Sequence, residues 1–191
     1  PNAWRSWVEN GIYRPLESEP IRAYRTAKEQ MPSRTADCAL LRAVHVHFRE
    51  NPYAFERFAA ELFRLTDRNV RRYEVTRSWR DGGRDVLGWY GIGHNNNCIA
   101  VEFAIEAKCY SDTTSVGVRD MSRLISRLRH RQFGVLVTTS FVNVSAYREI
   151  VDDGHPVLVL AGIDIVRTLR RAGRSDVASL RAWLKSDFPL D

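Results

Sequence analysis

Glu106 and Lys108 stand two residues apart in a run of alternating character, residues 101–109. The odd positions of this run are apolar or small, and every charged side chain falls on an even position. Alternation over this length predicts a β-strand with one face in the core. Glu106 and Lys108 would then project from the same face, with their Cα atoms roughly 7 Å apart. A carboxylate and an ammonium group would therefore share one small patch of the sheet.

A predicted β-hairpin brings a second carboxylate, that of Asp85, to the same patch. Residues 85–92 form another strand candidate, and residues 93–97 between the two strands have the composition of a turn. A hairpin centred in this turn pairs residues whose numbers sum to 191, which places Asp85 opposite Glu106 and on its face. A slip of one residue in the register would place Asp85 on the other face.

Two carboxylates this close repel each other unless a proton or a cation lies between them. A hard divalent cation with oxygen ligands, Mg²⁺ above all, resolves that repulsion. The alternative is that Asp85, Glu106 and Lys108 form an exposed ladder of ion pairs, an arrangement that is common and nearly neutral in free energy. The pair Gly82-Gly83 before Asp85 favours the metal site, because glycine permits backbone angles that bring the aspartate into position.

The spacing of Asp85 from Glu106-Ala107-Lys108, with 20 residues between them, resembles the signature of the PD-(D/E)xK nuclease superfamily. Within that superfamily it is most similar to the Mrr-like catalytic domains of restriction endonucleases. The match covers about residues 52–173, and four segments carry it in chain order: Phe55-Glu56, Asp81-Gly82-Gly83-Arg84-Asp85, Glu106-Ala107-Lys108 and Phe133-Gly134-Val135-Leu136-Val137-Thr138-Thr139-Ser140. Many Mrr-like members have glutamine where Glu106 stands, so this chain is closer to the general pattern of the superfamily.

The resemblance implies an α/β fold with a PD-(D/E)xK restriction-endonuclease-like core, in which helices flank a mixed central sheet. It implies that Asp85, Glu106 and Lys108 are catalytic and that Glu56 adds an accessory acid from a helix. Asp85, Glu106 and the backbone carbonyl of Ala107 would hold Mg²⁺, for which Mn²⁺ is the expected substitute. The carboxylates favour the charged form of Lys108, so we expect it to position the attacking water or stabilise charge on phosphorus.

The charge balance favours a polyanionic partner. The chain has a net charge of +6 and a sequence pI near 9.6, and arginine far outnumbers lysine. Arg119, Arg123 and Arg127 recur at every fourth position of a predicted helix, where they would contact phosphates of double-stranded DNA. The alternative is a solvated helix face on which these arginines form salt bridges with Asp120.

Helices and strands are predicted along most of the remaining chain. Periodicity indicates helices over residues 36–50, 53–66, 116–130, 143–151, 163–171 and 177–185, and further strands over residues 71–78, 133–139 and 156–160. The order helix, three strands, helix, strand, helix, strand is typical of a mixed sheet flanked by helices. Residues 1–50 are predicted to be an amino-terminal extension or linker with one helix, and residues 51–191 to be the nuclease catalytic domain.

Together with these patterns, the resemblance implies a Mg²⁺-dependent DNA endonuclease of the restriction type. Cleavage of both strands needs two sites, so we expect a homodimer or another two-site assembly on DNA. The resemblance also implies that target choice, such as a modified base, lies in a separate recognition domain or in the loops. Three cysteines without metal-type spacing, no membrane-length apolar run and no signal peptide favour the cytoplasm of a prokaryotic-type cell. The alternatives are a junction resolvase or repair nickase of the same fold, and a non-catalytic DNA-binding module.

Overall fold

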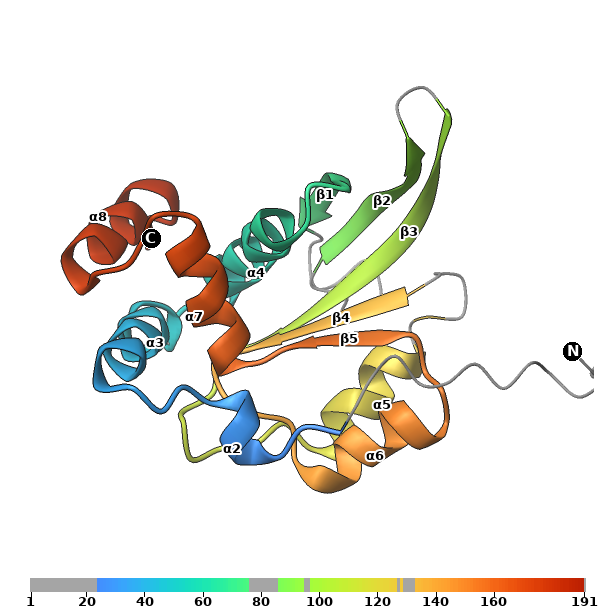
Figure 1. Ribbon diagram of the computed structural model, residues 1–191, viewed down its shortest axis with the longest axis horizontal. Helices are drawn as coiled ribbons and strands as arrows, with labels where there is room; N and C mark the ends of the chain where they lie inside the picture. The colour runs from blue at the N-terminus through green and yellow to red at the C-terminus, as the bar shows by residue number, and fades with distance from the viewer. Residues whose placement is uncertain (1–23, 76–85, 95–96, 127, 129–132, 191) are drawn as a thin grey trace, which may run out of the picture.

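A five-stranded mixed sheet forms the centre of the computed structural model, which describes residues 24–75, 86–94, 97–126, 128 and 133–190 (Figure 1). In sheet order the strands are β1 (Val70–Val75), β2 (Val86–His94), β3 (Asn97–Lys108), β4 (Phe133–Thr138) and β5 (Val157–Leu160). The pairs β1–β2 and β2–β3 are antiparallel, whereas the pairs β3–β4 and β4–β5 are parallel. The predicted mixed α/β sheet is therefore confirmed.

Helices cover both faces of this sheet (Figure 1). The described helices are α2 (Ala27–Gln30), α3 (Thr35–Phe48), α4 (Pro52–Thr66), α5 (Val118–Ser126), α6 (Val144–Asp152), α7 (Gly162–Arg171) and α8 (Val177–Asp187). One buried cluster joins side chains of α3, α4, α7 and α8 to one face of the sheet, and a second joins α5 and α6 to the other. None of the described helices is long and apolar enough to cross a membrane.

The long strand β3 is buried on both faces over its carboxyl-terminal half. Phe103 and Ile105 belong to the cluster with α4, whereas Ala104 packs among residues of α5 and α6, and all three are at most 1% exposed. The expectation that only one face of this strand lies in the core was therefore wrong. The reason is topological, because the parallel connections that follow β3 carry α5 and α6 to the face opposite α4.

The hairpin register confirms the sequence prediction over every described pair. Val86 lies opposite Ile105, and the pairing continues without interruption to His94 and Asn97, always with residue numbers that sum to 191. The backbone of Gly88 approaches the ring of Phe103 closely, since a Cβ there would lie 2.2 Å from the ring carbon Cζ. The glycine thus lets the aromatic ring lie against the neighbouring strand.

Helix α5 begins later than the predicted helix over residues 116–130. Val116 pairs instead with Val142 as an isolated parallel bridge, in which its amide donates to Phe141 and its carbonyl accepts from Asn143. These backbone groups are used outside the helix, so the helix starts at Val118. Residues 127 and 129–132 lie outside the described part of the chain.

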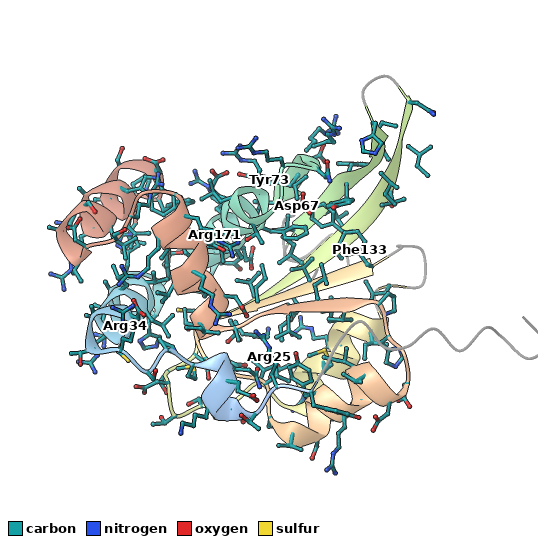
Figure 2. The ribbon with its side chains drawn as sticks, in the orientation of Figure 1. Arg25, Arg34, Asp67, Tyr73, Phe133 and Arg171 are labelled. Carbon is teal, nitrogen blue, oxygen red and sulfur yellow. The ribbon has the colours of Figure 1, made fainter. Side chains whose placement is uncertain are left out.

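The segment before α3 is attached to the core by buried polar contacts. The Arg25 guanidinium, labelled in Figure 2, donates to Asp164 at 2.8 Å and to the carbonyl of Val159 at 3.2 Å. Gln30 is fully buried and exchanges hydrogen bonds of 3.0 and 2.9 Å with the backbone of Val142. The described residues before position 51 thus pack on the sheet and its helices, while the domain boundary at residue 50 remains a prediction.

Candidate active site

Glu106 and Lys108 form a buried ion pair at the carboxyl end of β3. Lys108 Nζ lies 2.7 Å from Glu106 Oε1, and the two side chains are 16% and 1% exposed, the carboxylate being the more buried. The alternative of an exposed ion-pair ladder is wrong for these two residues, because a carboxylate this deeply buried has lost nearly all its water. A charged pair in such a place costs desolvation free energy that packing alone does not require. This buried pair is therefore the centre of the candidate active site.

The sheet topology places this pair at the carboxyl ends of the neighbouring strands β3 and β4. In the parallel pairing of β3 with β4, Glu106 lies opposite Leu136 and Lys108 lies opposite Thr138. Both strands end here, and the amide of Thr139 donates to the carbonyl of Lys108 at 3.3 Å. Ligands of open α/β sheets bind in the crevice beyond the carboxyl ends of the strands. Lys108 lies at this end of the sheet, and its side chain is 16% exposed.

The oxygen donors available at this end of β3 suit a hard cation such as Mg²⁺. Glu106 supplies a buried carboxylate, and the half-buried Ala107 supplies a peptide carbonyl next to it. The hairpin register runs up to the pair of Val86 and Ile105, one residue short of Glu106. Asp85, the predicted partner of Glu106, lies outside the described residues, and within the described part no group of three His, Cys, Asp or Glu side chains could hold a metal.

Glu56 lies on α4, whereas Arg119 and Arg123 lie on α5. Glu56 is half-buried on α4, and that helix packs on the face of β3 opposite the one that carries Glu106. Its role as an accessory acid remains a prediction. Arg119 and Arg123 are exposed on α5, and in the described part of the chain neither forms an ion pair with Asp120. Arg127 lies outside the described residues.

Tyr110 follows Lys108 by two residues, and the sequence prediction named neither Tyr110 nor Asp120 as a candidate site residue. The Tyr110 hydroxyl donates to Asp120 Oδ2 over a long distance of 3.5 Å. Burial raises the pKa of Tyr110, as do the charges of Asp120 and Glu106, while the Lys108 charge opposes them. The phenol therefore lies in the field of all three charges. The signal was present in the sequence, because the alternation that pairs Glu106 with Lys108 reaches Tyr110 at the next even position.

A cavity of about 430 Å³ opens near the same ends of β3 and β4. Residues of α3, of the segment before it, of the loop after β3 and of the end of β4 line it: Met31, Pro32, Cys38, Leu41, Arg42, His45, Ser111, Asp112, Thr113 and Thr139. Its wall mixes hydroxyl groups and a guanidinium with apolar groups. Room for a ligand larger than a single ion therefore exists at this edge of the molecule.

The sequence matches a known protein family, and the structure is similar to two solved structures. A family model described as Mrr_cat, restriction endonuclease, matches residues 49–169. The structure is similar to "DNA modification-dependent restriction endonuclease AspBHI", with a TM-score of 0.82, 46% identity, and coverage of 97% of this chain and 48% of that one. It is also similar to "MspJI Restriction Endonuclease in Complex with 27-mer Oligonucleotide", with a TM-score of 0.72, 33% identity, and coverage of 97% and 44%.

This chain thus spans about half the length of both solved proteins. No curated protein sequence matches it. The two structural similarities confirm the restriction-endonuclease-like α/β fold that the sequence predicted.

Proposed function

Since the chain belongs to the Mrr_cat restriction endonuclease family, we propose that it hydrolyses phosphodiester bonds of double-stranded DNA with Mg²⁺. The observation that carries this proposal is the buried pair of Glu106 and Lys108 at the open end of β3. A carboxylate that is 1% exposed beside an ammonium suits a reaction in which a cation and a phosphate must both be bound. Mn²⁺ is the expected substitute for Mg²⁺.

Asp85, Glu106 and the carbonyl of Ala107 are the proposed ligands of the metal. The described hairpin register supports Asp85 as a ligand, because one further step of the same register beyond Val86 and Ile105 would pair it with Glu106. When bound, Mg²⁺ neutralises phosphate oxygens and lowers the pKa of a coordinated water. Glu56 remains the proposed accessory acid of this site.

Lys108 has an electrostatic and positioning role in this proposal. The 2.7 Å contact with Glu106 favours the charged form of the ammonium. A fixed positive charge at the end of β3 stabilises negative charge that builds up on the phosphate as its bond to the leaving oxygen breaks. A neutral lysine acting as a base fits this contact poorly.

The exposed arginines of α5 are the proposed contacts to the DNA backbone. Arg119 and Arg123 are exposed to solvent, and Arg127 continues their spacing. Each guanidinium can bind a phosphate through two parallel hydrogen bonds. The similar MspJI structure is a complex with a 27-mer oligonucleotide, which supports a nucleic-acid substrate for this chain as well.

Target choice and assembly are further parts of this proposal. AspBHI is named as a modification-dependent enzyme, so we propose that a modified base directs cleavage by this chain too. Target reading by a separate domain and cleavage by a homodimer remain our proposals, since two strands require two sites. A cytoplasmic location is proposed with them.

Plasmid cleavage tests the proposed function. We expect Mg²⁺-dependent cleavage by the unmodified chain, and a loss of about a hundredfold or more in Lys108→Ala and in Asp85→Ala. Lys185→Ala, which removes an exposed lysine of α8, is the matched control and should cleave normally. Methylated and unmethylated plasmids are compared to test dependence on modification.

Three outcomes would count against this function. Equal cleavage by the chain and both site variants would remove Asp85 and Lys108 from the mechanism. Preferential cutting of four-way junctions would favour the resolvase alternative. DNA binding without cleavage, in Mg²⁺ and in Mn²⁺, would favour the non-catalytic binding module.

A further inference from the structure

The cavity of about 430 Å³ adjoins the backbone that carries the candidate active site. Thr139, one of its lining residues, donates its amide to the carbonyl of Lys108 at 3.3 Å. His45 lines the cavity from α3, and its carbonyl accepts a hydrogen bond of 3.8 Å from the thiol of Cys109. Ser111 lies three residues beyond Lys108, so their Cα atoms are at most about 11 Å apart.

The loop on one side of this cavity is fixed by hydrogen bonds from the end of β4. The hydroxyl of Thr139 donates to the carbonyl of Tyr110 at 2.6 Å, and the hydroxyl of Ser140 donates to the carbonyl of Thr114. Thr139 and Ser140 are at most 1% exposed. The hydroxyl groups of Ser111 and Thr114 lie 2.9 Å apart within the loop. A wall held in this way needs little reorganisation when a ligand enters.

Helix α3 contributes a guanidinium and an imidazole to the same cavity. Arg42 is exposed, and within the described part of the chain its side chain forms no hydrogen bond or ion pair. Arg170, by contrast, donates to the carboxylate of Asp37 on α3 at 2.7 Å. His45 follows Arg42 by three residues, so both side chains lie on one face of the helix. The cavity therefore holds a cation that no described carboxylate neutralises.

The remaining lining groups suit a nucleotide. A guanidinium binds a phosphate through two parallel hydrogen bonds, and the hydroxyl groups of Ser111 and Thr113 are further donors of the kind that contact phosphate and sugar. Three apolar side chains complete the wall: Met31, Pro32 and Leu41. They offer a surface for the sugar or the base. The volume of about 430 Å³ falls in the usual range of small-ligand sites.

We propose that this cavity binds a nucleotide of the substrate strand next to the scissile phosphate, with Arg42 on the phosphate of that nucleotide. This inference rests on the proposed nuclease function and names a substrate subsite outside the signature motif. A strand of DNA advances by roughly 3.4 Å along the duplex axis per nucleotide. A strand whose scissile phosphate lies at the end of β3 therefore carries one of its next few nucleotides to the cavity.

A simpler role for Arg42 is that of a solvated surface charge, which would favour DNA only through the net charge of the chain. Arg171 is the matched control, because it is an exposed arginine at the carboxyl end of α7, labelled in Figure 2. The other end of α7 lies at the cavity, since a Cβ on Gly162 would lie 2.7 Å from Leu41 Cδ2. A helix of this length separates Arg171 from the cavity by about 15 Å.

Fluorescence anisotropy with a labelled duplex, in Ca²⁺ to prevent cleavage, provides the first test. We expect Arg42→Ala to raise Kd about tenfold and to lower the slope of log Kd against log salt by about 0.9, the loss of one phosphate contact. Arg171→Ala should change Kd by less than about twofold. Equal changes in the two variants would overturn the proposal and leave the nuclease function intact.

Asp112 gives a test of opposite sign. It is the one carboxylate among the described residues that line the cavity, it is exposed, and its charge repels a phosphate bound there. Asp112→Asn should therefore lower Kd about threefold. Glu50→Gln removes the same charge from an exposed residue beyond the end of α3 and is the control. An effect of Asp112→Asn no larger than that of Glu50→Gln would place the phosphate outside the cavity.

Alkylation of Cys38 gives a further measurement that does not need activity. Cys38 is half-buried and lines the cavity, whereas Cys98 lies near the start of β3, about 33 Å along the strand from Lys108. With saturating duplex in Ca²⁺, methyl methanethiosulfonate should modify Cys38 severalfold more slowly than in the free chain, with Cys98 unchanged. Mass spectrometry resolves the three cysteines of the chain.

The outcomes separate the subsite from the reaction. Protection of Cys38 in a chain that binds DNA but cuts none, in Mg²⁺ and in Mn²⁺, would refute the nuclease function and retain the subsite. An unchanged rate at Cys38 while the duplex is bound would refute the subsite alone.

Discussion

Burial lowers the reactivity of the Cys109 thiol, which directly follows the end of β3. Burial raises the pKa of its thiol to about 11. The thiol lies 3.8 Å from the carbonyl of His45, in the layer between β3 and α3. Cys98, by contrast, is exposed in the hairpin. The thiolate fraction of Cys109 is therefore very small at neutral pH, and Cys98 differs from it by being open to solvent.

We expect iodoacetamide at pH 8 to alkylate Cys98 about tenfold faster than Cys109, or more, because only the thiolate reacts. A thiol with a pKa of about 11 is about 0.1% ionised at that pH, against roughly a quarter for an ordinary cysteine. Mass spectrometry of timed samples measures both rates. Equal rates in the folded chain would contradict the burial of Cys109, and a urea-unfolded sample serves as the control in which both react alike.

The raised pKa of Cys109 also makes the stability of the fold depend on pH. A thiol whose pKa is higher in the folded than in the unfolded chain stabilises the fold while it stays neutral in both states. That contribution is fully present below the ordinary value of 9.0 and is lost as the pH rises toward about 11. Alkaline unfolding, followed by circular dichroism, should therefore begin in this window, and Cys109→Ala should reduce its steepness.

At the scale of the element, α5 is expected to bind DNA through its exposed face. Removing Arg119 and Arg123 together should lower the slope of log Kd against log salt by about 2, because each phosphate contact contributes roughly 0.9. Fluorescence anisotropy with a labelled duplex, at several salt concentrations and in Ca²⁺ to prevent cleavage, measures the slope. The double variant should bind more weakly to every sequence alike.

The matched control for α5 is α8, which packs against α3 and belongs to the buried cluster on the other side of the sheet (Figure 1). Arg181 and Lys185 are exposed there, so their double alanine variant removes the same charge from the chain. Its salt slope should stay that of the unmodified chain. Equal loss of slope in both double variants would mean that net charge, rather than the position of α5, controls binding.

At the scale of the molecule, α3 packs the amino-terminal part of the described chain against the helices on one face of the sheet. Leu40, Val44 and Phe48 are fully buried in the cluster that also holds α4 and α7. A chain that begins at residue 51 loses these side chains, at about 2 to 5 kcal/mol for each large apolar group. We expect it to show no cooperative thermal transition by circular dichroism. A transition close to that of the full chain would support the predicted domain boundary at residue 50.

Local patterns were sufficient to predict most elements and the hairpin register. Side chains alternate with a period of two along a strand, so residues 101–109 and the turn before them specify which residues lie opposite one another. The described pairs from Val86 and Ile105 to His94 and Asn97 follow that prediction. The signature of Asp85, Glu106 and Lys108 also indicated the family from local sequence. Its spacing is set by the lengths of the two predicted strands and of the turn between them.

Only the tertiary structure decided what covers each face of those strands. Alternation predicts that Glu106 and Lys108 share a face, but it does not specify that α5 and α6 bury that face while α4 packs on the other. That choice depends on the parallel connections after β3, which join residues distant in sequence. The approach of Asp120 to Tyr110 follows from the same packing. Local chemistry thus predicted that Glu106 and Lys108 share a face, and long-range topology decided their burial and their neighbours.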